Sequence, residues 1–151
     1  MISCTEFIPA YSEMFKFLEA RGGKEAVLDF WRYLSDNFLG NLRSLVREHG
    51  LRGCWLYWNH TLNEEAADFT MTLDEEAGEF SIVMHHCPSK GRLLEYTHIT
   101  PYHDYCGHCD LLYRRVLEPL GYEYIYDMSG CEHASCRLTI RRLQQAKGRE
   151  I

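Results

Sequence analysis

The segment from residue 24 to residue 49 carries the clearest helical pattern in the chain, and it constrains the fold more than any other stretch. Its apolar side chains recur at intervals of three and four residues, which places them on one face of an α-helix. They are Val27, Phe30, Trp31, Leu34, Phe38, Leu42, Leu45 and Val46. We expect Gly40 to kink or split this helix and Gly50 to end it. An aromatic stripe with this spacing indicates a buried core face rather than a binding site.

Helical patterns also flank this segment. Residues 1–9 are interpreted as a short arm, and residues 11–21 have helical spacing that the Gly22-Gly23 pair interrupts. Residues 51–65 favour a further helix. The first 65 residues are therefore predicted to be helical almost throughout.

The hydrophobic period changes after residue 67. Residues 68–74 and 80–87 alternate apolar and polar side chains around a turn, which predicts a β-hairpin that Pro88 ends. Residues 122–128 and 136–142 predict two further strands, with alternating tyrosines in the first. Between the pairs, Thr100-Pro101 resembles a helix start, with an end near Glu118. This order predicts one α+β domain over residues 1–151, with N-terminal helices packed on a small antiparallel sheet, a cysteine-bearing helix between two hairpins, and a tail at 144–151.

Composition excludes several classes of protein. A chain of 151 residues with 46% hydrophobic and 25% charged residues is typical of one soluble domain. A formal net charge of −6 argues against a nucleic-acid surface, which needs clustered Lys and Arg. No apolar run approaches the roughly 20 residues that span a bilayer. The first residues lack the pattern of a signal peptide, so we expect a cytoplasmic location with no membrane partner. Whether the chain forms a homo-oligomer is left open.

Cysteines and histidines are concentrated between residues 83 and 137. Five of the seven cysteines and six of the eight histidines lie in this third of the chain. An odd number of cysteines in a non-secreted protein fits a disulfide framework poorly. Metal binding, thiol chemistry and plain burial are the remaining interpretations.

The spacing of the late cysteines favours a metal site. Cys106 and Cys109 form one close pair, and Cys131 and Cys136 form a second about twenty residues later. We predict that Cys87, Cys106, Cys109 and Cys136 surround a pocket, with Cys131 or a histidine such as His86 as a substitute ligand. Zinc is the first choice and an iron–sulfur cluster the alternative, because four thiolates suit both. Under the competing interpretation the cysteines are small buried hydrophobes.

Two polar residues are candidates for proton transfer beside these thiols. If a helix starts at Thr100, then His103, Cys106, Cys109 and Asp110 share one broad face. Asp110 beside a metal-bound water would act as a general base, and His103 is the best-placed histidine. We expect His108 on the surface.

These residues carry a resemblance to a known family. Cys87-Pro88, Tyr105-Cys106-x2-Cys109-Asp110, the helix end at Glu118-x2-Gly121, and the segment from Cys131 to Cys136 resemble the C-terminal half of the L-2-amino-thiazoline-4-carboxylic acid hydrolase family. The resemblance covers about fifty residues. More distantly, the layout is similar to ligand-binding domains named after 4-vinyl reductase.

The resemblance implies hydrolysis of a small cyclic thioimidate, in which water adds to the ring carbon and the C–S bond opens to an N-carbamoyl cysteine. Cys87, Cys106, Cys109, Asp110 and Cys136 are the positions that carry over. The segment Cys131-Glu132-His133-Ala134-Ser135-Cys136 departs from the family pattern, which expects adjacent acidic or cysteine residues there.

Three hypotheses about function follow. The first is a metal-dependent, hydrolase-like enzyme acting on a small molecule, with Asp110 or His103 moving protons. The second is a non-catalytic domain that senses a ligand or metal through a cysteine-rich site. The third is nucleophilic catalysis by Cys87 or Cys106, activated by His86 or His103.

Overall fold

The computed structural model of the chain describes residues 4–65 and 67–143, and it has the predicted α+β architecture. The helices of the described part are α1 (Cys4–Phe38), α2 (Gly40–His49), α3 (Leu51–Glu64), α4 (Pro88–Glu95) and α5 (Gly107–Leu117). The strands are β1 (Asp68–Asp74), β2 (Glu79–His86), β3 (Tyr122–Asp127) and β4 (Cys136–Arg142). Short 3-10 helices, η1 (Glu118–Leu120) and η2 (Cys131–His133), flank β3. The predicted tail at 144–151 lies outside the described residues.

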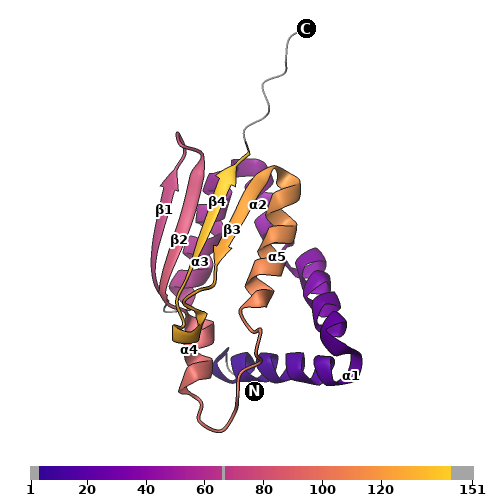
Figure 1. Cartoon of the computed structure of the whole chain (residues 1–151). Helices are drawn as coiled ribbons and strands as arrows, with labels where there is room; N and C mark the ends of the chain where they lie inside the picture. The colour runs from indigo at the N-terminus through magenta and orange to yellow at the C-terminus, as the bar shows by residue number, and fades with distance from the viewer. Residues whose placement is uncertain (1–3, 66, 144–151) are drawn as a thin grey trace.

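The four strands form one antiparallel sheet in the order β1-β2-β4-β3. Side chains that alternate along the strands meet on one face, where Phe80 pairs with Ile140 and Ile82 with Leu138. Helices α2, α3 and α5 cover this face, and α4 lies below the ends of the strands (Figure 1). The predicted bounds of β1 and β4 are confirmed, and β2 and β3 differ from the prediction by a single residue at one or both ends.

Helix α1 consists of two arms that meet at Gly23, whose φ of 68° and ψ of −174° are not helical. The bend is visible in Figure 1. It lies where the Gly22-Gly23 pair predicted the end of the first helix, and the second arm follows directly. The helix is interrupted a second time at Leu39, next to Gly40, where the sequence predicted a kink or split. Because of this break Leu39 is buried and Phe38 is 71% exposed, so the prediction that Phe38 belongs to the core is wrong.

The predicted helix from Thr100 begins seven residues later, at Gly107. Residues 102–106 form consecutive turns instead, with Tyr105 N–H bonded to the Tyr102 carbonyl. The cause is tertiary: Tyr102 is buried, and its backbone N–H donates to the Ser12 hydroxyl on α1 at 2.8 Å. Anchoring Tyr102 to α1 prevents an earlier helix start.

The molecule has two apolar cores. The larger lies between the sheet and helices α2, α3 and α5, and includes Trp58, Phe80 and Leu112. The smaller joins the two arms of α1 to α4 and to the turns before α5, through Phe15, Trp31, Leu93, Tyr102 and Tyr105. Cys87 and Cys136 pack against the larger core and Cys106 against the smaller one. The late cysteines therefore lie where the two cores meet.

Candidate functional site

The structure brings the five late cysteines to one small cavity. Four separate elements supply them: the start of α4, the start of α5, helix η2 and the start of β4. The thiols that line the cavity are Cys87, Cys106, Cys109, Cys131 and Cys136. All five are partly buried and none forms a disulfide. The expected convergence of these residues is therefore found.

Backbone contacts explain why the elements converge. Cys87 caps the N-terminus of α4, where its sulfur accepts from the N–H of Lys90 at 3.4 Å. Its own N–H donates to the carbonyl of Ala134 at 2.7 Å, which ties α4 to the connection between β3 and β4. Ala134 adopts a left-handed conformation (φ 57°) that turns the chain from η2 into β4. Cys131 and Cys136 are thus placed on either side of that turn.

The cavity between the thiols has a volume of about 20 Å³. That is room for about one water molecule or one ion. Within residues 4–65 and 67–143, no three His, Cys, Asp or Glu side chains are arranged to hold a metal ion. Zinc or an iron–sulfur cluster at these thiols stays a prediction, which elemental analysis of the purified protein tests.

Burial favours the protonated form of Cys106, Cys109, Cys131 and Cys136. It raises the pKa of Cys109 well above the ordinary value, and the neighbouring thiols raise it further. Burial also raises the pKa of Cys136 to about 11. Burial likewise raises the pKa values of Cys106 and Cys131, and the charge of Lys90 opposes both shifts.

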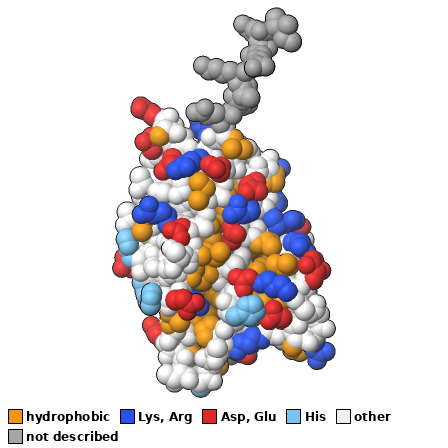
Figure 2. Space-filling view, in the orientation of Figure 1, with side chains coloured by type: hydrophobic (Ala, Val, Ile, Leu, Met, Phe, Trp, Pro, Cys, Tyr) orange, Lys and Arg blue, Asp and Glu red, His pale blue; other side chains and the backbone are white. Residues whose placement is uncertain are grey.

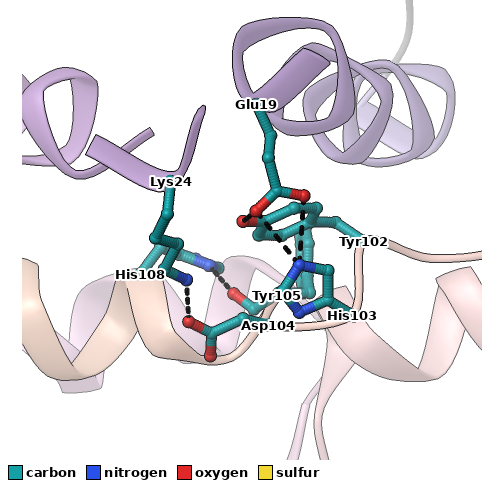
Figure 3. Close-up of polar contacts among 7 residues, drawn as sticks. All are labelled: Glu19, Lys24, Tyr102, His103, Asp104, Tyr105 and His108. Carbon is teal, nitrogen blue, oxygen red and sulfur yellow. Dashed lines mark hydrogen bonds and ion pairs between the residues drawn. The ribbon is translucent and has the colours of Figure 1, made fainter. Parts of the chain in front are cut away.

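His108 is the site residue that the sequence analysis missed. The prediction that it lies on the surface is wrong, because its ring is buried against Tyr11, Phe15 and Tyr105. Nδ1 bonds the carbonyl of Tyr105 (Figure 3), and Nε2 lies 3.4 Å from the sulfur of Cys109. Burial lowers the pKa of His108 to about 4, so the imidazole is neutral at pH 7.

A larger cavity of about 220 Å³ adjoins the thiols, between the inner face of the sheet and helices α3 and α5. The two cavities share six residues. Cys87, Ser89, His108, Cys109, Tyr126 and Cys136 line both. The remaining wall of the large cavity is apolar or aromatic, from Trp58, Leu62, Ile82, Met84, Pro88, Tyr113, Tyr124 and Leu138. Among the residues that the structure describes, no carboxylate, ammonium or guanidinium group lines it.

One cation lines the small cavity. Lys90 is 8% exposed, and no carboxylate of residues 4–65 or 67–143 forms an ion pair with it. Its charge acts on both Cys106 and Cys131. Beside it, the Ser89 hydroxyl and the Tyr105 phenol are hydrogen-bonded at 2.6 Å.

The two residues predicted to move protons lie elsewhere. Asp110 lines neither cavity and pairs with Arg114 on its own helix at 2.6 Å. The side chain of His103 is 67% exposed, with Nε2 3.1 Å from the Glu19 carboxylate of α1 (Figure 3). The expectation that both face the thiols is wrong. For His103 it depended on a helix starting at Thr100, whereas Asp110 lies on α5 and is engaged by Arg114 one turn later.

His86, the predicted substitute ligand, is also outside the site. It is exposed, and its ring lies over Gly91 of α4, where an added Cβ would meet Nε2 at 2.3 Å. Strand β2 ends at His86, so the chain turns into α4 before this ring can reach the cavity. His85 instead bonds Thr70 on β1 at 2.8 Å.

Comparisons with protein-family models, curated proteins and solved structures each gave no match. The resemblance described above therefore remains an expectation. In the part of the chain that the structure describes, every helix is too short or too polar to cross a bilayer. On the face seen in Figure 2, acidic and basic side chains are interspersed.

Proposed function

We propose that this chain is a small-molecule-binding domain whose large cavity holds one compact, mainly apolar ligand. The observation that carries the proposal is the cavity itself, which is lined by aromatic and aliphatic side chains and bounded at one end by thiols and a neutral imidazole. Binding sites of small molecules are mostly apolar, with a few convergent polar groups that fix orientation. The large cavity has both the apolar wall and the few polar groups at one end.

The size of the cavity supports a ligand of about one or two rings. An apolar cavity of ~150 Å³ is large enough to bind benzene. The cavity here has about 220 Å³, so a bicyclic compound such as indole is a suitable probe. Tyr113, Tyr124 and Tyr126 supply ring faces along the wall, and Trp58 supplies a further aromatic face.

The test is a titration with indole, followed by isothermal titration calorimetry, native mass spectrometry and thermal unfolding. We expect one indole per chain and a stabilisation of about 2.7 kcal/mol at a hundredfold excess over the dissociation constant. Glycerol, a polar molecule of small size, is the control ligand and should produce none of these effects. Absence of saturable indole binding at millimolar concentration would overturn the proposal.

Two matched variants locate the binding. Ile82 lines the cavity on β2, whereas Ile125 is partly exposed on β3. Ile82→Phe should fill the cavity and weaken indole binding at least tenfold, while Ile125→Phe should leave the affinity unchanged. Circular dichroism checks that both variants fold, since added volume in a core costs about 1–3 kcal/mol.

Hydrolysis of a small cyclic thioimidate or amidine is a second candidate, favoured by one observation. His108 presents a neutral imidazole to both cavities, which is the state that a general base requires. We expect such an activity to depend on His108 rather than on Asp110 or His103. Conversion of 2-aminothiazoline-4-carboxylate to N-carbamoyl cysteine, followed by NMR, tests it. Turnover that survives His108→Asn but not Asp110→Asn would contradict this assignment.

A further inference from the structure

Lys90 is a buried cation without a counter-ion at the thiol end of the site. It is 8% exposed, and its ammonium group forms no ion pair and no hydrogen bond with residues 4–65 or 67–143. A buried charge is costly unless a group of opposite charge pairs with it. We propose that the ligand of the large cavity is a small aromatic carboxylate, whose ring lies in that cavity and whose carboxylate group is bound by Lys90 and Ser89.

The position of Lys90 suits this role. It lines the small cavity, which adjoins the large one and shares six lining residues with it. The small cavity has a volume of about 20 Å³, the space of about one water molecule and so of one carboxylate oxygen. A ring in the large cavity can therefore direct one oxygen of its carboxylate toward Lys90.

Ser89 supplies the second contact. It lines both cavities, and its hydroxyl is hydrogen-bonded to the phenol of Tyr105 at 2.6 Å. The two hydroxyls carry two protons but share one bond, so one O–H is left without an acceptor among the described residues. Both side chains line the small cavity, and that proton is therefore available to a ligand oxygen placed there.

The start of α4 adds a further donor. Ser89 and Lys90 are the second and third residues of this helix. The backbone N–H groups of Lys90 and Gly91 bond to the sulfur and the carbonyl of Cys87. The N–H of Ser89 has no such partner among the described residues. A free N–H at a helix N-terminus favours an anion.

The walls of the two cavities lack a group that would bind a cationic ligand. Among the residues that the structure describes, no carboxylate lines either cavity. The imidazole of His108 is neutral, and its Nε2 already lies 3.4 Å from the sulfur of Cys109. The polar groups left for a ligand at the thiol end are thus donors, which match a carboxylate and not an ammonium group.

This inference rests on the proposed function, and calorimetric titration of the whole chain separates the two. The probes are phenylacetate, phenylacetamide and 2-phenylethylamine, which are similar in size and differ in charge at pH 7, with indole titrated beside them. We expect phenylacetate to bind at least about tenfold more tightly than phenylacetamide, because hydrogen bonds to a charged group are the stronger ones. The amine should bind more weakly than either. Equal affinities for phenylacetate and phenylacetamide in a chain that binds indole would overturn this inference alone, whereas a chain that does not bind indole overturns the proposed function.

Variants assign the preference to Lys90. Lys90→Gln removes the charge and should bring the affinities for phenylacetate and phenylacetamide to within about twofold of each other, whereas Lys90→Arg should keep phenylacetate the tighter ligand. Ser89→Ala should weaken phenylacetate binding about tenfold. Lys16→Gln is the matched control, because Lys16 lies on α1 and pairs with Glu13, and it should leave the preference unchanged. Circular dichroism checks that each variant folds, and a preference for phenylacetate that survives Lys90→Gln would refute the role of this lysine.

Discussion

The ring of His108 lies between the carbonyl of Tyr105, which Nδ1 bonds, and the sulfur of Cys109, 3.4 Å from Nε2. Since a carbonyl only accepts, Nδ1 carries the proton and Nε2 is left as the acceptor. Nε2 therefore accepts from the Cys109 thiol, which burial keeps protonated. The side chains of His108 and Cys109 are therefore both uncharged, and the proton that they share is bonded to the sulfur.

This arrangement predicts a pH dependence of stability. The pKa of His108 is about 4 in the folded chain, lowered from 6.5 by burial, although the Tyr105 carbonyl and the Asp104 charge oppose that shift. The unfolded chain therefore binds the extra proton first as the pH falls. Stability associated with His108 is complete above pH 6.5 and is lost as the pH falls toward 4, by about 3 kcal/mol.

Urea unfolding at pH 7 and pH 4.5 measures this effect, with His108→Asn as the test variant. Asn keeps a donor for the Tyr105 carbonyl but does not titrate, so the variant should lose less stability on acidification than the parent chain. His103→Asn, at an exposed histidine, is the control and should behave like the parent. Equal acid sensitivity of all three proteins would contradict the predicted role of His108.

The contact between Asp110 and Arg114 predicts a small effect for Asp110→Asn. The two side chains are about one third exposed and lie one helical turn apart. Ion pairs of this kind contribute less than about 1 kcal/mol to the free energy of unfolding. We expect the free energy of unfolding to fall by no more than that, with indole affinity unchanged. A tenfold loss of indole affinity would contradict the placement of Asp110 outside the site.

Local sequence patterns predicted the sheet well for a physical reason. Alternation with a period of two is set by the strand itself, so Phe80, Ile82, Leu138 and Ile140 identify the inner face without any tertiary information. The grouping of the late cysteines was predictable too, because the strand ends and helix starts that carry them meet at one end of the sheet, beside its central strands β2 and β4. Neither prediction required knowledge of α1.

The start of α5 was not predictable from local signals. Thr100-Pro101 has the pattern of a helix start, but the contacts of Tyr102 with Ser12 and Glu19 on α1 override it. This error placed His103 on the predicted thiol face, whereas the pairing of Asp110 with Arg114 is a side-chain contact within α5. His108 did leave a signal, because His108, Leu112 and Val116 recur every four residues and are all buried on α5.

The stacking of Phe80 on Trp58 predicts that Phe80 is a major source of stability. Phe80 is fully buried, with ring centroids 5.7 Å apart and an interplanar angle of 18°. Phe80→Ala should lower the free energy of unfolding by about 3–5 kcal/mol, because apolar burial is lost and a cavity is left behind. Phe38→Ala is the matched control, since Phe38 is 71% exposed and should cost less than about 0.5 kcal/mol. Chemical denaturation compares the two, and similar costs would place Phe38 in the core after all.

The close crossing of α2 and α3 depends on Gly53. A Cβ at this position would lie 2.2 Å from the carbonyl oxygen of Leu45 and 2.7 Å from the backbone nitrogen of Val46. Because both neighbours are backbone atoms, Gly53→Ala must push the helices apart, and we expect a loss of at least about 2 kcal/mol. Gly40→Ala is the control, since, apart from its chain neighbours and its own helix backbone, no described atom lies within 4 Å of its added Cβ. The free energy of unfolding of that variant should be unchanged or rise by about 0.5 kcal/mol, because alanine lowers the conformational entropy of the unfolded chain. Thermal unfolding of both variants tests the crossing, and an unchanged midpoint for Gly53→Ala would show that α2 and α3 do not pack this closely.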